Sequence, residues 1–293
     1  MRMKAKVINT ILFTKMLQSV EKLNKTCVIK FTKDKIYLIV SKIELTELQV
    51  WGQVAVDLLF EEFIIESANN NEIWIELRTD QVIRVLKSAQ AAIDVYCKLT
   101  KKTGLPSLSF NIKSMYRGDN PVLLVQDIPI RVLNLYHINE YKEPMVPQPH
   151  VHILMPPLVS VRTIIDRMKS MSNYLTISAN FNGEFILKIE TEAVSVETYF
   201  KDLISPDLNQ VNNSSQQDKP KNQFSECQIS IIDFEKFVHS YVINPSSVIC
   251  SIIENFAVVF YVYVKNETMS YMDYDQETRQ FGALTYYIPA IIT

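Results

Sequence analysis

Glycine is scarce in this chain of 293 residues, and the few copies exclude the common nucleotide-binding loops. The five glycines are Gly52, Gly104, Gly118, Gly183 and Gly282. None stands in a G-x-G-x-x-G turn or a Walker loop, the two motifs that cradle phosphates with backbone N–H groups. The sequence therefore has no obvious phosphate cradle, and it shows no constellation of residues that favours an enzyme.

Cysteine is equally sparse, and potential metal ligands do not cluster. The four cysteines stand alone in strand-like runs without a C-x-x-C pair: Cys27, Cys97, Cys227 and Cys250. Such isolated cysteines are expected to pack in the core rather than to bind metal or carry redox chemistry. His150 and His152 share one face of a predicted strand, but no third ligand follows nearby. We expect neither a metal nor a cofactor.

Long apolar runs are also missing. The run near the end, Ala257–Val264, is far shorter than the roughly 20 residues that span a bilayer, and Lys4, Lys6 and Lys15 interrupt the first segment. We therefore expect a cytoplasmic or nuclear protein without a membrane partner. The net charge is only −2, so any contact with nucleic acid requires positive charge that is segregated on one surface.

What the sequence does contain is a strand–helix–strand block within residues 69–102. Ile73, Ile75 and Leu77 alternate with polar or aromatic residues, as in a strand with one buried face. We expect Thr79 or Asp80 to cap the helix that follows. A second strand begins at Ile93.

The apolar stripe of this helix occurs four times at nearly equal intervals. Each copy has apolar residues at i, i+3, i+4 and i+7, which is the pattern of one buried helix face. The copies begin at Phe13, Val82, Val161 and Phe234. Each follows a strand-like run and precedes several more, so the sequence predicts an α+β protein of four βαβββ units. Thr10 is the expected cap of the first helix.

A proline-rich segment divides these units into two pairs. Pro144, Pro147 and Pro149 fall within six residues and favour an extended path. We predict an N-terminal domain at 1–133, a connector at 134–149 and a C-terminal domain at 150–293. Residues 205–222 are rich in Asn, Ser, Gln and Asp, and we expect this insertion to be disordered.

Several short motifs, in order along nearly the whole chain, resemble one protein family. They are Lys22–Cys27, Asn71–Ile73, Leu86–Gln90, Gln126–Ile130, Glu143–Pro147, Met168–Asn173, Asn182–Glu184, Leu187–Thr191, Phe200–Leu203 and Tyr287–Ala290. With them the chain resembles the PCNA-like sliding clamps, and within these the Hus subunit of the checkpoint clamp, the heterotrimeric nine-one-one ring. The match departs at Ile43–Thr46, at Ser114–Pro121 and in the insertion.

The resemblance implies two clamp domains with antiparallel sheets outside and paired helices inside. It further implies a non-enzymatic subunit of a one-to-one-to-one ring with two Rad-family clamp subunits. Such a ring encircles double-stranded DNA in the nucleus, is loaded by an ATP-driven clamp loader and serves as a platform for repair and signalling proteins. A homotrimeric replication clamp is the alternative, and a DNA-repair enzyme is a third reading for which no catalytic residues are found.

The backs of the four helices supply the residues expected to face DNA. The cationic candidates are Lys15, Lys22, Lys25, Arg84, Lys87, Arg162, Lys169 and Lys236. In a clamp they would touch phosphates without reading bases, which permits sliding. The alternative for each of them is an ordinary solvated helix face.

A second site is implied beneath the connector, where sliding clamps accept short hydrophobic partner peptides. The expected lining is Ile43, Leu135, Ile138, Pro289 and Ile291. The alternative is that these apolar residues only hold the connector and the last strand against the body of the protein.

Overall fold

The computed structural model describes residues 1–41, 46–115, 121–206, 220–264 and 282–291. They form two compact units. The N-terminal unit is built mainly from Met1–Ser41 and Val50–Lys142, and the C-terminal unit mainly from Glu143–Val264 and Leu284–Thr293. The division between Lys142 and Glu143 falls inside the predicted connector. Ile43 and most of the predicted insertion lie outside the described residues.

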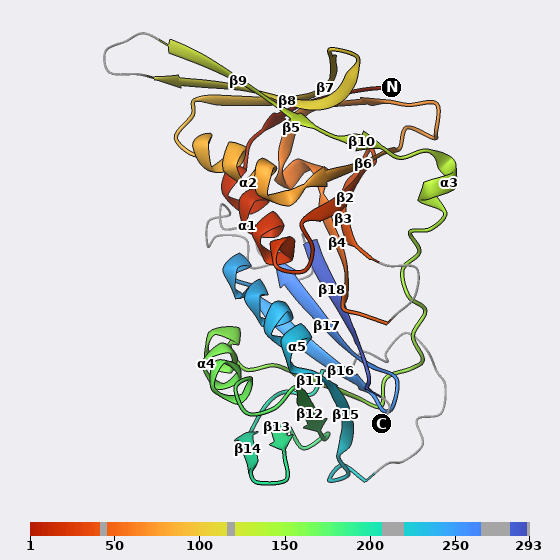
Figure 1. The fold of residues 1–293 in the computed structure, drawn as a ribbon, viewed down its shortest axis with the longest axis vertical. Coiled ribbons are helices and arrows are strands. Elements are labelled where there is room, and N and C mark those ends of the chain that lie inside the picture. The colour runs from red at the N-terminus through yellow and green to blue at the C-terminus, as the bar shows by residue number, and fades with distance from the viewer. Residues whose placement is uncertain (42–45, 116–120, 207–219, 265–281, 292–293) are drawn as a thin grey trace, which may run out of the picture. The chain divides into compact units, whose positions relative to one another are not determined.

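The N-terminal unit contains two βαβββ repeats, which confirms the predicted element order for this half (Figure 1). The first repeat comprises β1 (Arg2–Val7), α1 (Thr10–Glu21), β2 (Thr26–Phe31), β3 (Lys35–Val40) and β4 (Gln49–Ala55). A 3₁₀ turn, η1 (Val56–Leu58), and β5 (Phe60–Glu66) lead to the second repeat. That repeat comprises β6 (Ile73–Arg78), α2 (Thr79–Ser88), β7 (Asp94–Lys102), β8 (Leu105–Met115) and β9 (Pro121–Pro129), followed by the short β10 (Arg131–Val132).

The two repeats exchange their first strands. β1 pairs antiparallel with β7 in a sheet of order β5-β1-β7-β8-β9, whereas β6 pairs with β2 beside β3 and β4. Helices α1 and α2 lie side by side on one face of this unit (Figure 1). Their predicted stripes are buried, with Leu17, Val20, Val82 and Leu86 fully inaccessible to solvent. The helices therefore close the core of the unit with the periodicity that the sequence predicts.

The helix caps differ from the expectation. The cap of α1 is Asn9, whose side-chain Oδ1 accepts a hydrogen bond from the Leu12 N–H at 2.9 Å, because Thr10 is already the first helical residue. Within the first turn, the Thr10 carbonyl accepts a hydrogen bond from the Thr14 hydroxyl. At α2 neither Thr79 nor Asp80 caps the helix, since Arg78 precedes it without a side-chain cap. Both cap predictions are therefore wrong.

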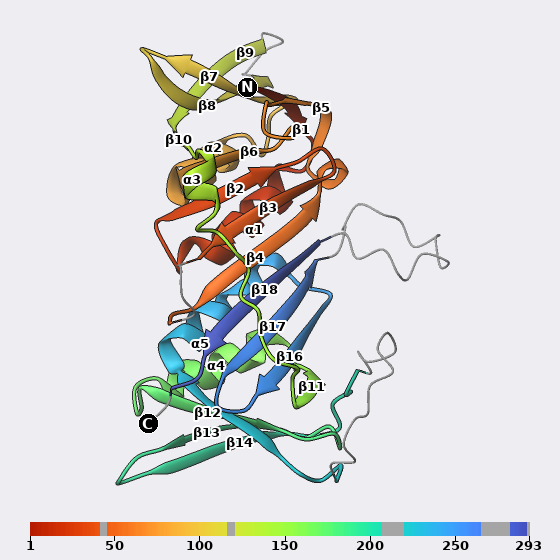
Figure 2. The same cartoon turned by 90° about the vertical axis from the view of Figure 1, so that its right-hand side faces the viewer.

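The connector begins with a helical turn rather than running extended throughout. After β10 the chain forms α3 (Leu135–Ile138), and no regular secondary structure follows until β11. Ile138 and Tyr141 pack against a cluster formed by Val28, Trp74 and Leu133. Figure 2 shows α3 in front of β2, β3 and β6, with α1 and α2 on the far side of these strands.

The C-terminal unit repeats the same plan. Its elements are β11 (Val151–Leu154), α4 (Leu158–Met168), β12 (Tyr174–Ala179), β13 (Phe185–Glu190), β14 (Ser195–Phe200), β15 (Ser225–Ser230), α5 (Ile231–Val238), the 3₁₀ turn η2 (His239–Ile243), β16 (Ser247–Ile253), β17 (Ala257–Val264) and β18 (Gly282–Pro289). Strands are again exchanged, because β15 pairs with β12 and β11 pairs with β16. The predicted fold class is thus confirmed in both halves.

Aromatic packing fills the core of this unit. Phe237 stacks on Phe260 with ring centroids 3.9 Å apart, and Phe234 lies 5.6 Å from the same ring. The fourth predicted stripe ends early, since Tyr241 is only half-buried. The reason is that α5 ends at Val238 and tightens into η2, where the 3.6-residue period no longer holds.

Candidate nucleic-acid interface

The solvent-facing side of α1 and α2, with the turn after α1, gathers positive charge. We call it the N-terminal helix surface and define it by its cations Lys15, Lys22, Lys25, Arg78, Arg84 and Lys87. Against these six, residues 10–25 and 78–92 contain only two acidic residues, Glu21 and Asp80. Lys22, Lys25 and Lys87 are exposed, and none of them has an ion-pair partner among the residues that the structure describes. Lys15 is half-buried.

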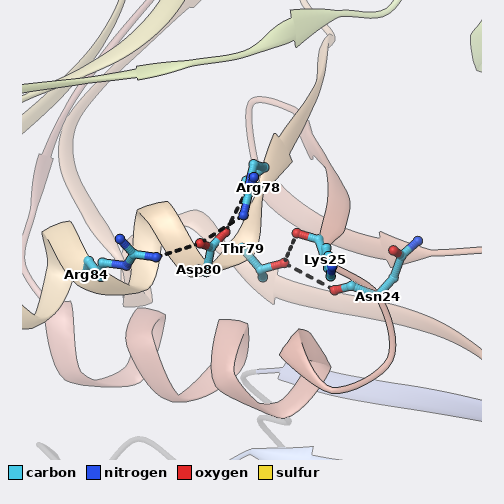
Figure 3. A network of polar contacts seen from close by, with 6 residues as sticks. All are labelled: Asn24, Lys25, Arg78, Thr79, Asp80 and Arg84. Atoms are coloured by element: carbon cyan, nitrogen blue, oxygen red, sulfur yellow. Dashed lines mark hydrogen bonds and ion pairs between the residues drawn. The ribbon is translucent and has the colours of Figure 1, made fainter.

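Asp80 organises the arginines of this surface. Arg78 donates two hydrogen bonds to its carboxylate, at 3.1 and 3.2 Å, and Arg84 donates one at 2.8 Å from the next turn of α2 (Figure 3). The hydrogen bond from Arg78 is the main cause that holds the pKa of Asp80 below its ordinary value. An acidic side chain in the first turn also interacts favourably with the positive end of the helix dipole. Two cations share one anion here, so the group keeps a net positive charge.

Thr79 ties the start of α2 to the turn that carries Lys25. Its hydroxyl donates to the carbonyl of Lys25 at 3.0 Å and more weakly to that of Asn24 at 3.4 Å (Figure 3). The Thr79 N–H donates to the same Lys25 carbonyl at 3.1 Å. Because Thr79 is fully buried, these bonds fix the backbone of the turn and leave the Lys25 side chain in solvent.

The predicted cations of the C-terminal unit are engaged with neighbouring side chains. Lys169, the residue directly after α4, donates to Asp166 within α4 and to Glu235 on α5, both at 2.8 Å, and these two bonds raise its pKa. Arg162 donates to the Tyr241 hydroxyl at 2.6 Å with its guanidinium 4.7 Å from the centre of that ring. Lys236 is paired with Asp233 at 2.8 Å.

We call these three cations together with Arg167 the C-terminal helix surface. Arg167 was not among the predicted residues, although it is exposed and has no ion-pair partner within the described ranges. Its position opposite the buried stripe of α4 could have identified it from the sequence. Three carboxylates accompany the four cations within residues 158–172 and 230–244, namely Asp166, Asp233 and Glu235. The positive excess is therefore much smaller than on the N-terminal helix surface.

The predicted peptide pocket is represented only in parts. Ile138 packs on the Trp74 cluster of the N-terminal unit, and Pro289 and Ile291 are half-buried residues of the C-terminal unit. Ile43 and the side chain of Leu135 lie outside what the structure describes. Ile138 also lines a cavity of about 470 Å³ in the N-terminal unit, with Trp74, Val132 and Tyr136 among its walls.

Two sheet edges expose apolar side chains that the sequence analysis did not single out. β9 is the last strand of its sheet, and its residues Val122–Val125 are all exposed, with Leu123 at 64%. β14 is an edge strand of the C-terminal unit and exposes Tyr199. Unpaired edges with apolar side chains are ready partners for a strand of another chain. The run Val-Leu-Leu-Val in a strand without alternation was the available signal.

Within the described ranges, no group of three or more His, Cys, Asp or Glu side chains is arranged to hold a metal ion. His152 instead lies 2.6 Å from the Ser251 hydroxyl, and burial lowers its pKa. His150 accepts a hydrogen bond from the Glu254 N–H. Among the helices that the structure describes, none is both long and apolar enough to cross a bilayer.

Solved structures of proliferating cellular nuclear antigen have the same arrangement of elements. The chain aligns with proliferating cellular nuclear antigen (PCNA) of Entamoeba histolytica with a TM-score of 0.69, at 11% identity and over 99% of both chains. PCNA of Thermococcus kodakaraensis gives a TM-score of 0.66 at 14% identity, over 98% of this chain and 99% of the other. The fold is therefore that of PCNA.

Sequence comparison gives the family. The model described as Hus1-like protein matches residues 1–292. Checkpoint protein HUS1 of Homo sapiens is 33% identical over 92% of this chain and 98% of its own length. The checkpoint protein hus1 homolog of Dictyostelium discoideum is 31% identical over 100% of this chain and 99% of its own. With a family model that covers nearly every residue and relatives that match over their full length, the chain belongs to the Hus1-like family.

Proposed function

We propose that this chain is a non-enzymatic subunit of a DNA sliding clamp in the DNA-damage checkpoint. Its family is Hus1-like, its full-length relatives are named checkpoint proteins, and its fold is that of PCNA. The likeness to PCNA is at 11% and 14% identity and concerns the fold, so it does not favour a homotrimeric replication clamp.

One observation carries the DNA-binding part of this proposal. A chain with a net charge of −2 concentrates six cations against two anions on the outer side of one helix pair. Solubility depends on the overall charge and does not require the cations to gather on one surface. DNA binding does require it, because lysines and arginines that contact phosphates release the counterions of the duplex. The contacts need no base readout, which suits a clamp that moves along DNA.

The assembly is a further part of the proposal. In it, two Rad-family clamp subunits complete a one-to-one-to-one ring, an ATP-driven loader places the ring on duplex DNA in the nucleus, and repair and signalling proteins dock near the connector. The exposed edges β9 and β14 support a ring, since each chain would offer one edge to each neighbour. The pocket of Ile43, Leu135, Ile138, Pro289 and Ile291 stays the proposed peptide site.

Light scattering on the purified chain tests the assembly. Alone, it should have the monomer mass of 33.9 kDa. With both partner subunits co-expressed, it should elute at the summed mass of one copy of each chain. A stable trimer of this chain without partners would contradict the checkpoint assignment and favour the replication clamp.

A further inference from the structure

We propose that this chain contacts DNA phosphates mainly through the N-terminal helix surface, whereas Arg162 and Lys169 tie the C-terminal helices together and Lys236 is held in an ion pair within α5. The inference rests on the proposed clamp function and narrows it to particular residues. It divides the eight cations that the sequence predicts to face DNA into two groups with different roles.

The first step is the state of each cation before DNA arrives. Lys22, Lys25 and Lys87 are exposed and have no carboxylate partner among the described residues, so a phosphate replaces only water and mobile ions. Lys169 already bonds two carboxylates, and Lys236 bonds one. A phosphate that approaches either lysine must displace a carboxylate or accept its repulsion. The gain from such a contact is correspondingly smaller.

The second step is the charge of the surroundings, which does not depend on side-chain rotamers. Residues 158–172 and 230–244 contain four Lys or Arg and three Asp or Glu, an excess of one positive charge. The corresponding segments of the N-terminal unit, 10–25 and 78–92, have an excess of four. Counterion release follows the number of phosphates that are neutralised, so most of it is expected at the N-terminal helix surface.

The third step is what the paired cations do instead. Lys169 follows α4 directly and bridges Asp166 to Glu235, so one ammonium links two helices. Arg162 reaches from α4 to η2 by both a hydrogen bond and a stacked contact on Tyr241. These interactions hold the C-terminal helices in register. Arg167 is the exception on this surface, since it has no ion-pair partner in the described part of the chain, and we expect it to contribute one phosphate contact.

The experiment compares two sets of substitutions that each remove two lysines. The test variant is Lys25→Gln with Lys87→Gln. The control removes lysines together with carboxylate partners, through Lys169→Gln, Glu235→Gln, Lys236→Gln and Asp233→Asn, so the net charge is unchanged. Asp166, the second partner of Lys169, keeps its ion pair with Arg162 at 3.6 Å. Each ring is preassembled with its partner subunits and checked by light scattering. Its association with a linear duplex of about 30 base pairs is then measured by fluorescence anisotropy between about 50 and 200 mM salt, a range over which phosphate contacts weaken strongly.

The inference predicts that the test variant lowers the magnitude of the salt slope by about 1.8, at about 0.9 per lost contact, whereas the control changes it by less than about 0.5. Equal losses in both variants, or a larger loss in the control, would overturn it. A wild-type ring that shows no salt-dependent association would instead reject the DNA-binding function itself. If either variant ring does not assemble, Lys25→Gln against the pair removal Lys169→Gln with Glu235→Gln gives the same comparison.

Discussion

At the scale of single residues, Gly183 shows how closely the chain approaches itself in the C-terminal unit. The turn between β12 and β13 contains Asn182 and Gly183, and Gly183 has a φ of +83°. Glycine is required here for a second reason besides the positive φ. A Cβ at this position would lie 2.2 Å from the Leu203 carbonyl oxygen. Asn180 organises the same turn by accepting bonds from the N–H groups of Asn182 and Glu184.

We expect Gly183→Ala to destabilise the protein by about 2–4 kcal/mol, since a left-handed backbone costs an L-residue about 1–2 kcal/mol and the clash adds to it. Gly104→Ala is the matched control, with a φ of +84° and no atom within 4 Å of the added Cβ. It should cost only the backbone term. Urea unfolding followed by circular dichroism gives both values, and equal losses would show that the approach of Leu203 is unimportant.

At the scale of elements, the start of α2 depends on a charge arrangement rather than on a cap. Asp80→Asn should lower the stability of the N-terminal unit by about 0.5–1 kcal/mol, because both arginines lose their anion and the helix dipole loses its partner. Both tryptophans, Trp51 and Trp74, lie in this unit, so their fluorescence reports its urea transition. Asp57→Asn, at an exposed position without an ion pair among the described residues, should change little.

The effect of Asp80→Asn should also depend on pH. The folded protein lowers the pKa of Asp80 below its ordinary value of 3.8, so the carboxylate stabilises the fold at every pH above that value. As the pH falls through the lowered pKa, the carboxylate is protonated and the stabilisation is lost. The difference between wild type and variant should therefore be full at pH 7 and shrink below about pH 4. A difference that grows in acid would contradict this assignment.

The helices also show which features of the site were within reach of the sequence. Periodicity identified the buried stripes, because burial of one helix face leaves a signal within a dozen residues, as at Val82 and Leu86. The ion pairs could not be predicted from the sequence. Lys169 and Glu235 are 66 positions apart, and they come into contact only when α4 and α5 pack together. The Asn9 cap was missed because Asn9 and Thr10 are both good capping residues and one residue decides between them.

At the scale of the whole molecule, β9 is expected to join this chain to only one of its neighbours. Leu123→Glu with Val125→Glu places two carboxylates on an exposed edge strand, where they oppose pairing with another chain. The variant should lose its complex with one partner subunit and keep the complex with the other, which the β14 edge would contact. Pairwise co-expression followed by light scattering separates a two-chain mass from a monomer.

The control for this prediction is Leu105→Glu, at an equally exposed apolar position at the start of β8. It should retain both pairwise complexes. Loss of both partners in the β9 variant, or of neither, would show that this edge is not a dedicated contact. The run Val122–Val125 marks an apolar strand in the sequence, but it does not show that the strand lies at a sheet edge, because the position of a strand within a sheet is a property of the complete fold. β9 and the neighbouring β8 are both rich in apolar residues.

The exchange of first strands between repeats constrains how the protein can be made on the ribosome. β1 is synthesised first, yet its pairing with β7 joins Lys6 to Tyr96, and its sheet is complete only when β9 at 121–129 has emerged. The first repeat thus reaches solvent as α1 and a three-stranded sheet that still lack their neighbours. Pairings so distant in sequence close slowly. The N-terminal unit should fold as a single cooperative step late in its own synthesis, and a chain released after β5 should be a substrate for chaperones rather than a stable half-domain.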